Sequence, residues 1–417
     1  MLRRLMAVLK WGGLILLLLI GSWVAFNGPW ADAPARPRPA ALTPAPLQVG
    51  ESSAYAMLLG EKAHVDMPSA PPWQCGAQGG NCAEVWLQQS DKLHEQLKSA
   101  GEFAGICEAA SAEGVSWVEP AIKLPEQNPA AAPIPQFKNI TACHRWLRAQ
   151  AVLAALDGDD TKALQFLRRA DRTMRGALDG AQSLIGHAIA WSLARQQWQT
   201  LAALAGKRPQ LAGPMQEFVR PLDAVALRTE RWIATESAFP QAVMRDMPRS
   251  CQAMNDAPEE VHGWLDRFWC RSKLGFLPEL SAQEMDAYFL QLLERTHDGA
   301  VQAAAHRPAA EPTPSTWAWR NSVGHILVVV AQPNWYQYVD KQAEVELARQ
   351  AAELILRMTA EHVPTAQREA WLQAQPLPSK TKGRFSLSAD HHQLRAQPWR
   401  DDEEASRQLS FPLPSNS

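Results

Sequence analysis

The sequence has no excess of charge of either sign. Its 417 residues include 41 Lys and Arg against 43 Asp and Glu, a formal net charge of −2 at pH 7. Proteins that bind nucleic acid concentrate basic residues on one face, whereas the basic residues here are scattered. We therefore expect no nucleic-acid partner.

Motifs for catalysis and for cofactors are missing as well. The chain contains no H-E-x-x-H, no G-x-S-x-G, no Walker loop and no G-x-G-x-x-G. Ser379 and Lys382 have the S-x-x-K spacing, but the companion motifs are missing and the surrounding prolines and lysines argue against a helix. The sequence therefore predicts no particular reaction, and we expect no cofactor.

Cysteine is scarce, with six residues and none before position 75. No two have the C-x2-C spacing of a zinc site, so we expect no metal. An even number of cysteines beyond an apolar N-terminal segment is typical of disulfides in an oxidising compartment. Proximity in the sequence favours three bonds, Cys75 to Cys82, Cys107 to Cys143 and Cys251 to Cys270.

One long hydrophobic run is present, near the N-terminus. The 22 residues from Leu5 to Phe26 would form a helix of about 33 Å, enough to cross a bilayer. Arg3, Arg4 and Lys10 precede its apolar centre, which places the N-terminus inside. We expect residues 1–26 to be a single-pass inner-membrane anchor, with the remainder in the periplasm of a Gram-negative cell.

A cleaved secretory signal is the alternative interpretation of this run. The segment Ala31 to Ala33 resembles a signal-peptidase site, but Pro34 follows it and the run is long for a signal. We favour an uncleaved anchor. Six prolines between Pro29 and Pro46 then predict a stiff, solvated tether over residues 27–50, with a reach on the order of 60 Å.

Beyond the tether the pattern is mainly helical, and we expect one disulfide-containing domain over residues 51–370. Apolar residues at helical spacing flank the turn at Asp157 to Asp160 and predict a helical hairpin. The run Ile326 to Val330 fits either a strand or a buried helix. The proline-rich stretch from Pro120 to Pro135 predicts a long loop. Further helices are expected over 182–205, 215–235, 259–272, 282–296 and 341–361.

The C-terminal part carries the best strand signal. Two short alternating runs on either side of Ala389 to His392 predict a small β-hairpin within residues 371–400. Residues 401–417 are expected to form a loose tail.

Aromatic residues suggest a binding surface. Most of the 14 tryptophans beyond residue 30 should be core, but Trp335, Tyr336 and Tyr338 follow a proline in an expected loop, where exposed rings could anchor a protein partner. They are our candidate binding residues.

The sequence supports three hypotheses for function. We favour a non-enzymatic binding or scaffold protein, anchored in the membrane, that engages a protein of the cell envelope. An envelope hydrolase acting on cell-wall material is the alternative, for which Glu230, Glu236 and His187 lie on helices and could converge. The third is an immunity-type protein that neutralises a toxin in the periplasm.

Overall fold

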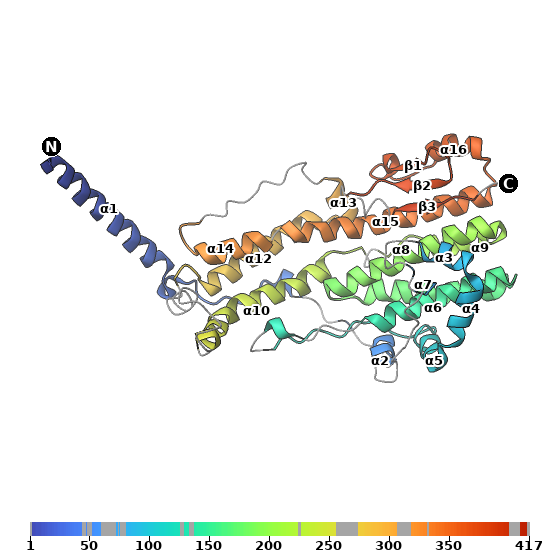
Figure 1. The fold of residues 1–417 in the computed structure, drawn as a ribbon, viewed down its shortest axis with the longest axis horizontal. Helices are drawn as coiled ribbons and strands as arrows, with labels where there is room; N and C mark the ends of the chain where they lie inside the picture. Colours follow the sequence, from blue (N-terminus) through green and yellow to red (C-terminus); the bar gives the residue numbers. More distant parts are fainter. Residues whose placement is uncertain are drawn as a thin grey trace.

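A computed structural model gives the fold of the chain (Figure 1). The described part is mainly helical, with a small antiparallel sheet near the C-terminus. It comprises residues 2–43, 47, 52–59, 72–73, 75, 81–125, 129–132, 137–223, 227–255, 274–306, 318–331, 333–399 and 409–414.

The N-terminal helix α1 (Leu2–Asn27) projects from one end of the molecule (Figure 1). Its last 18 residues have a mean hydropathy of 1.4, and 6% of them are buried. Leu17 is 68% exposed. Among the described helices, α1 is the one long and apolar enough to cross a membrane, a property that anchors and signal sequences share.

Four long helices form the centre of the body. The predicted helical hairpin is confirmed, because α6 and α7 pack together across a turn in which Gly158 has φ 83° and Asp159 caps α7. Helix α8 packs against both α7 and α15. It is buried on nearly every side, so its sequence carries no polar stripe. The four helices are α6 (Lys138–Leu156), α7 (Asp160–Gly180), α8 (Leu184–Lys207) and α15 (Pro333–Ala360).

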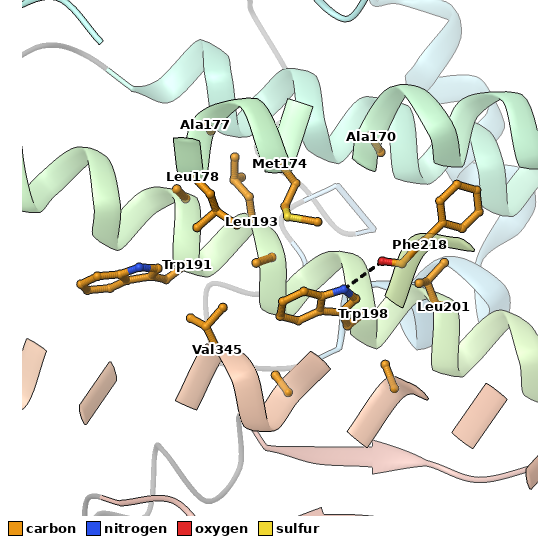
Figure 2. Close-up of a cluster of buried hydrophobic side chains, with 14 of the residues drawn as sticks. Ala170, Met174, Ala177, Leu178, Trp191, Leu193, Trp198, Leu201, Phe218 and Val345 are labelled. Carbon is orange, nitrogen blue, oxygen red and sulfur yellow. Dashed lines mark hydrogen bonds between the residues drawn. The ribbon is translucent and has the colours of Figure 1, made fainter. Parts of the chain in front are cut away.

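Figure 2 shows the core at the meeting of α7, α8 and α15. Trp191 and Trp198 come from α8 and are almost fully buried, with Met174 and Val345 beside them. The indole N–H of Trp198 donates to the carbonyl of Phe218 at 3.4 Å, so it keeps a partner inside the core. Burying one large apolar side chain contributes about 1.5–3 kcal/mol, so this cluster is a main source of stability.

Shorter helices surround this centre, and two disulfides fasten them. One joins Cys75 to Cys82 and the other Cys107 to Cys143, with Cα atoms 4.9 and 5.4 Å apart. Both pairings are as predicted, whereas the third pair lies outside the described side chains. The shorter helices are α2 (Ala54–Leu59), α3 (Cys82–Gln88), α4 (Ser90–Lys98), α5 (Gly101–Ala110), α9 (Ala212–Met215), α13 (Ala300–Ala305) and α16 (Arg368–Ala374).

The expected helix over 215–235 is wrong in its middle. Helix α9 ends at Met215, a 3-10 turn covers Gln216–Val219, and α10 (Glu230–Asn255) begins eleven residues after that turn. Pro221 explains the break, since it lacks an N–H and disfavours helical geometry in the residue before it. Arg220 accordingly has φ −55° and ψ 151°. The helix expected over 259–272 lies outside the described residues.

Helices α10, α12 (Pro278–Thr296) and α14 (Ser322–Ala331) form the end of the body nearest α1 (Figure 1). The run from Ile326 to Val330, which the sequence left open between strand and buried helix, belongs to α14. This helix is only partly buried, because Val328 is 1% exposed but Val330 is 65% exposed.

The segment that follows α1 lies along α10 and α12. The carboxylate of Asp32 accepts hydrogen bonds from the backbone N–H groups of Glu279 and Leu280, at 3.2 and 3.0 Å, and so caps α12. Arg38 donates to the carbonyl of Ala234 on α10. These contacts join positions more than 190 residues apart in the chain.

The expectation of a solvated tether over residues 27–50 is therefore wrong for the part that the structure describes. Proline and alanine content sets the stiffness of a free segment, but it does not show whether the polar side chains within it find partners. Here Asp32 and Arg38 do, and the segment is docked.

A three-stranded antiparallel sheet closes the chain, in the order β1-β2-β3. Strands β1 (Phe385–Leu387) and β2 (Gln393–Ala396) form the predicted hairpin. The expectation of a loose tail is wrong for residues 409–414, because β3 (Ser410–Pro412) pairs with β2 and Phe411 is fully buried.

Candidate functional site

A cavity of about 420 Å³ lies where the N-terminus of α8, the first turns of α10 and the segment after Trp117 meet. Ligand sites are typically about 300–1,000 Å³. We call it the Glu236 cavity. Its polar lining is Arg38, Glu119, Gln182, Ser183, Thr235 and Glu236, and its apolar lining is Pro120, Ala121, Ile122, Leu124, Ala132, Ile185, Ala238 and Phe239.

Glu119 is fully buried and holds the start of α8. One carboxylate oxygen accepts the backbone N–H groups of Gln182 and Ser183 at 2.7 and 2.9 Å, and the other accepts the hydroxyl of Ser183. Burial raises the pKa of Glu119, and the hydrogen bonds from Ser183 and Gln182 offset part of that rise. Glu119 therefore acts as a cap for backbone donors that the helix leaves unsatisfied.

Glu236 reaches the same helix end from α10. Its Oε1 accepts the backbone N–H of Leu184 at 2.7 Å. Burial raises the pKa of Glu236, and the nearby charge of Glu119 raises it further. The positive end of the α8 dipole favours both carboxylates here, but their mutual repulsion favours protonation of one of them.

Arg38 brings a positive charge to the cavity from the docked segment. Its guanidinium donates to the Ala234 carbonyl and to the Ser237 hydroxyl, while its Nε is buried without a hydrogen-bond partner in the described part. Burial lowers the pKa of Arg38, and the negative charge of Asp286 works in the opposite direction. The cavity thus combines one cation and two acids with apolar walls.

This arrangement suits binding better than hydrolysis. Glycoside hydrolysis needs one carboxyl group to protonate the leaving group and a second to attack or to activate water. Glu119 already accepts three hydrogen bonds, one from Gln182 and two from Ser183, directly before α8. Glu236 lines the cavity, where it can meet a hydrogen-bond donor or a cation on a ligand whose apolar part lies against the walls.

Of the three residues considered for a hydrolase, the structure brings only Glu236 into this cavity. His187 lies one turn into α8 and is 1% exposed, with Nδ1 at 2.9 Å from the carbonyl oxygen of Ser183. Burial lowers the pKa of His187 to about 4. Glu230 is the first residue of α10, six positions before Glu236, and is not part of the lining.

The expected aromatic loop is a helix. Trp335, Tyr336 and Tyr338 lie in the first turns of α15, which begins at Pro333. Proline is favoured in the first turn of a helix, because its missing N–H has no intrahelical partner there. The expectation of a loop at this proline is therefore wrong.

These three side chains do not form one surface. Trp335 packs into the body, stacked on Trp232 with ring centroids 6.3 Å apart and edge-on to Phe289 at 5.1 Å. The hydroxyl of Tyr336 accepts a hydrogen bond from Arg295. That tyrosine lines a second cavity of about 480 Å³, together with Asp298, His306 and Asp340. The ring of Tyr338 lies 5.0 Å from the ammonium of Lys341.

Two charged residues of the Glu236 cavity were not predicted from the sequence. Glu119 is the lone acid in the otherwise uncharged run from Val115 to Ile122, and a single carboxylate in such a run was the available signal for a buried acid. Arg38 gave no such signal, because its neighbours are those of a solvated proline-rich segment.

Comparison of the chain with protein-family models, with curated proteins and with solved structures finds no match.

Proposed function

We propose that this chain is a membrane-anchored binding protein of the periplasm, and that the Glu236 cavity receives an apolar segment of a protein partner. The cavity itself is the observation that carries the proposal. Its walls are apolar, and its two acids accept backbone hydrogen bonds at the start of α8. Location across the inner membrane is supported by α1 and by the two disulfides, which persist in oxidising compartments.

The chemistry of the cavity restricts the kind of partner segment that could bind there. A lysine or arginine on an apolar segment could pair with Glu236 while neighbouring aliphatic side chains contact Ile185 and Phe239, which are each 40% exposed. Arg38 could donate a hydrogen bond to a carboxylate or to a backbone carbonyl of the partner. A volume of about 420 Å³ suits a few side chains rather than a folded domain.

The test is crosslinking in the cells that make the protein. A benzophenone amino acid in place of Ile185, at the cavity, should capture one defined protein. The same group in place of Leu156, which is 39% exposed at the end of α6, is the matched control. The Glu236→Gln change keeps an oxygen that can accept from Leu184 but removes the charge, so it should strongly reduce capture.

A Glu217→Gln variant controls for loss of an acid, since Glu217 forms an exposed ion pair with Arg168. Equal capture by the Glu236→Gln variant and the unaltered protein would argue against the proposal. Capture of a secreted toxin would identify an immunity-type role. Cell-wall hydrolysis that is lost in Glu236→Gln would favour the hydrolase, for which the raised pKa of Glu236 is the supporting observation.

A further inference from the structure

We propose that α14 is a membrane-contact surface, and that its exposed apolar face lies in the outer headgroup region of the same bilayer that α1 enters. This inference rests on the proposed membrane anchoring. It adds a second contact between the protein and lipid, independent of the Glu236 cavity.

The first observation is the apolar face itself. Val323, Ile326 and Val330 are 39%, 43% and 65% exposed. Positions at i, i+3 and i+7 lie along one side of a helix. The opposite side of α14 is anchored in the body, with Val328 buried. The three residues therefore form a stripe that the body leaves uncovered.

The second observation is the connection of this stripe to α1. Asn27, the last residue of α1, is fully buried. Its side-chain amide donates to the carbonyl of Trp319 at 2.6 Å, and its own carbonyl accepts the N–H of Gly275 at 3.0 Å. Gly275 in turn accepts the N–H of Val323 at 2.8 Å. A short chain of hydrogen bonds thus joins the end of the anchor to the first residue of the stripe.

These hydrogen bonds hold α14 close to the end of α1. Figure 1 shows α14 at the end of the body from which α1 projects. Because no free spacer separates them, the point where α1 leaves the bilayer and the stripe lie at one end of the molecule. Gly275 has φ 79°, a geometry that favours glycine, so the connection depends on this residue.

The composition around the stripe fits a bilayer interface. Residues 318–331 contain no acid. Trp319 is 37% exposed and Arg320 is also exposed, and tryptophan and arginine are typical of the boundary between headgroups and acyl chains. Amphipathic helices of this kind bury their apolar face about 5–10 Å into that boundary.

Lipid crosslinking of the full chain tests the inference. The protein is reconstituted in vesicles of phosphatidylethanolamine and phosphatidylglycerol with a benzophenone amino acid in place of Val330, and lipid adducts are measured by mass spectrometry. Leu156, on the far end of α6, is the water-facing control, and Leu17 within α1 is the lipid-facing control. We expect adducts at Val330 severalfold above those at Leu156.

Two results would overturn the inference and can be told apart. Adducts at Leu17 together with a Val330 yield no higher than that of Leu156 would leave the anchor intact and remove the membrane surface. A lack of adducts at Leu17 would remove the anchor and, with it, the inference. A crosslink from Val330 to a second copy of the chain, in place of lipid, would also overturn it by assigning the stripe to self-association.

Discussion

Helix α14, at the end of the body nearest α1, leaves more large apolar side chains exposed than any described helix from α3 to α8. In the part built by α3 to α8, Trp86, Trp191 and Trp198 are almost fully buried, and a disulfide ties α5 to α6. By contrast, α14 leaves three β-branched residues exposed although its other side is packed. The same chain can bury large rings completely, so the exposed stripe is a local feature of α14 rather than a sign of poor packing.

The two ends also differ in how they are held together. The α3 to α8 part relies on disulfides and buried side chains. The end nearest α1 also buries side chains, such as Trp232 and Phe289, but hydrogen bonds of Asp32 and Asn27 join it to distant segments. We expect perturbations of the first part to lower global stability, and perturbations of the second to loosen the attachment of α1 with little effect on the core.

The largest effect should come from removing the bond between Cys107 and Cys143. Closing a loop of 36 residues stabilises by about 4 kcal/mol on the chain-entropy model. The double change to alanine should lower the free energy of unfolding by that amount in a urea titration. The same change at Cys75 and Cys82, which are seven residues apart, should cost about 2 kcal/mol. Equal losses would show that loop length does not decide the effect.

The next effect concerns acid stability. The pKa of His187 is lowered to about 4 in the folded state, against about 6.5 unfolded. Its contribution is therefore complete above pH 6.5 and is lost as the pH falls toward 4, by about 3 kcal/mol. His187→Gln should unfold with a flatter pH dependence between these values than the unaltered protein.

The exposed His306 offers a control for that experiment. His306→Gln, which removes an exposed imidazole, shows how the loss of a surface histidine alters the same titration. An unaltered slope in His187→Gln would mean that His187 is not held neutral by burial.

The smallest effect is expected at Asp32. Removing a carboxylate that caps a helix typically costs about 1 kcal/mol, so Asp32→Ala should change global stability little. It should, however, release the segment after α1 from α12, and limited proteolysis within residues 33–43 should become faster. Asp32→Asn keeps an acceptor oxygen for one of the two N–H groups, so it should be cleaved at a rate between those of the unaltered protein and Asp32→Ala. Equal cleavage of all three proteins would show that the cap does not hold the segment.

Periodic patterns predicted the helices well. The stripes on either side of Asp157 to Asp160 gave α6 and α7, and proximity in the sequence gave both disulfides that the structure describes. These features depend on neighbours in the chain. The two errors at prolines are of opposite kinds: a helix was expected across Pro221, where the helix breaks, and a loop was expected at Pro333, where a helix begins. A proline can do either, and the outcome depends on tertiary contacts.

Features that depend on distant partners could not be predicted. Nothing around Asp32 indicates that it caps a helix almost 250 residues later, and nothing after position 401 indicates that Phe411 completes a sheet. The sequence analysis named Glu236 only as one of two acids, with a histidine, that lie on helices. Its neighbour Glu119, which contributes to its raised pKa, comes from a loop more than 100 residues earlier. Convergence of this kind is a property of the fold.

The buried end of α1 has a consequence for how a partner would be met. For a chain anchored in a bilayer, the hydrogen bonds of Asn27 would prevent the body from rotating freely about α1. The Glu236 cavity would then keep a fixed distance from the membrane surface and a fixed orientation to it. A partner embedded in the same membrane would then search in two dimensions rather than three. Confinement of that kind raises effective concentration without any added contact, which would allow a weak site to act as a selective one.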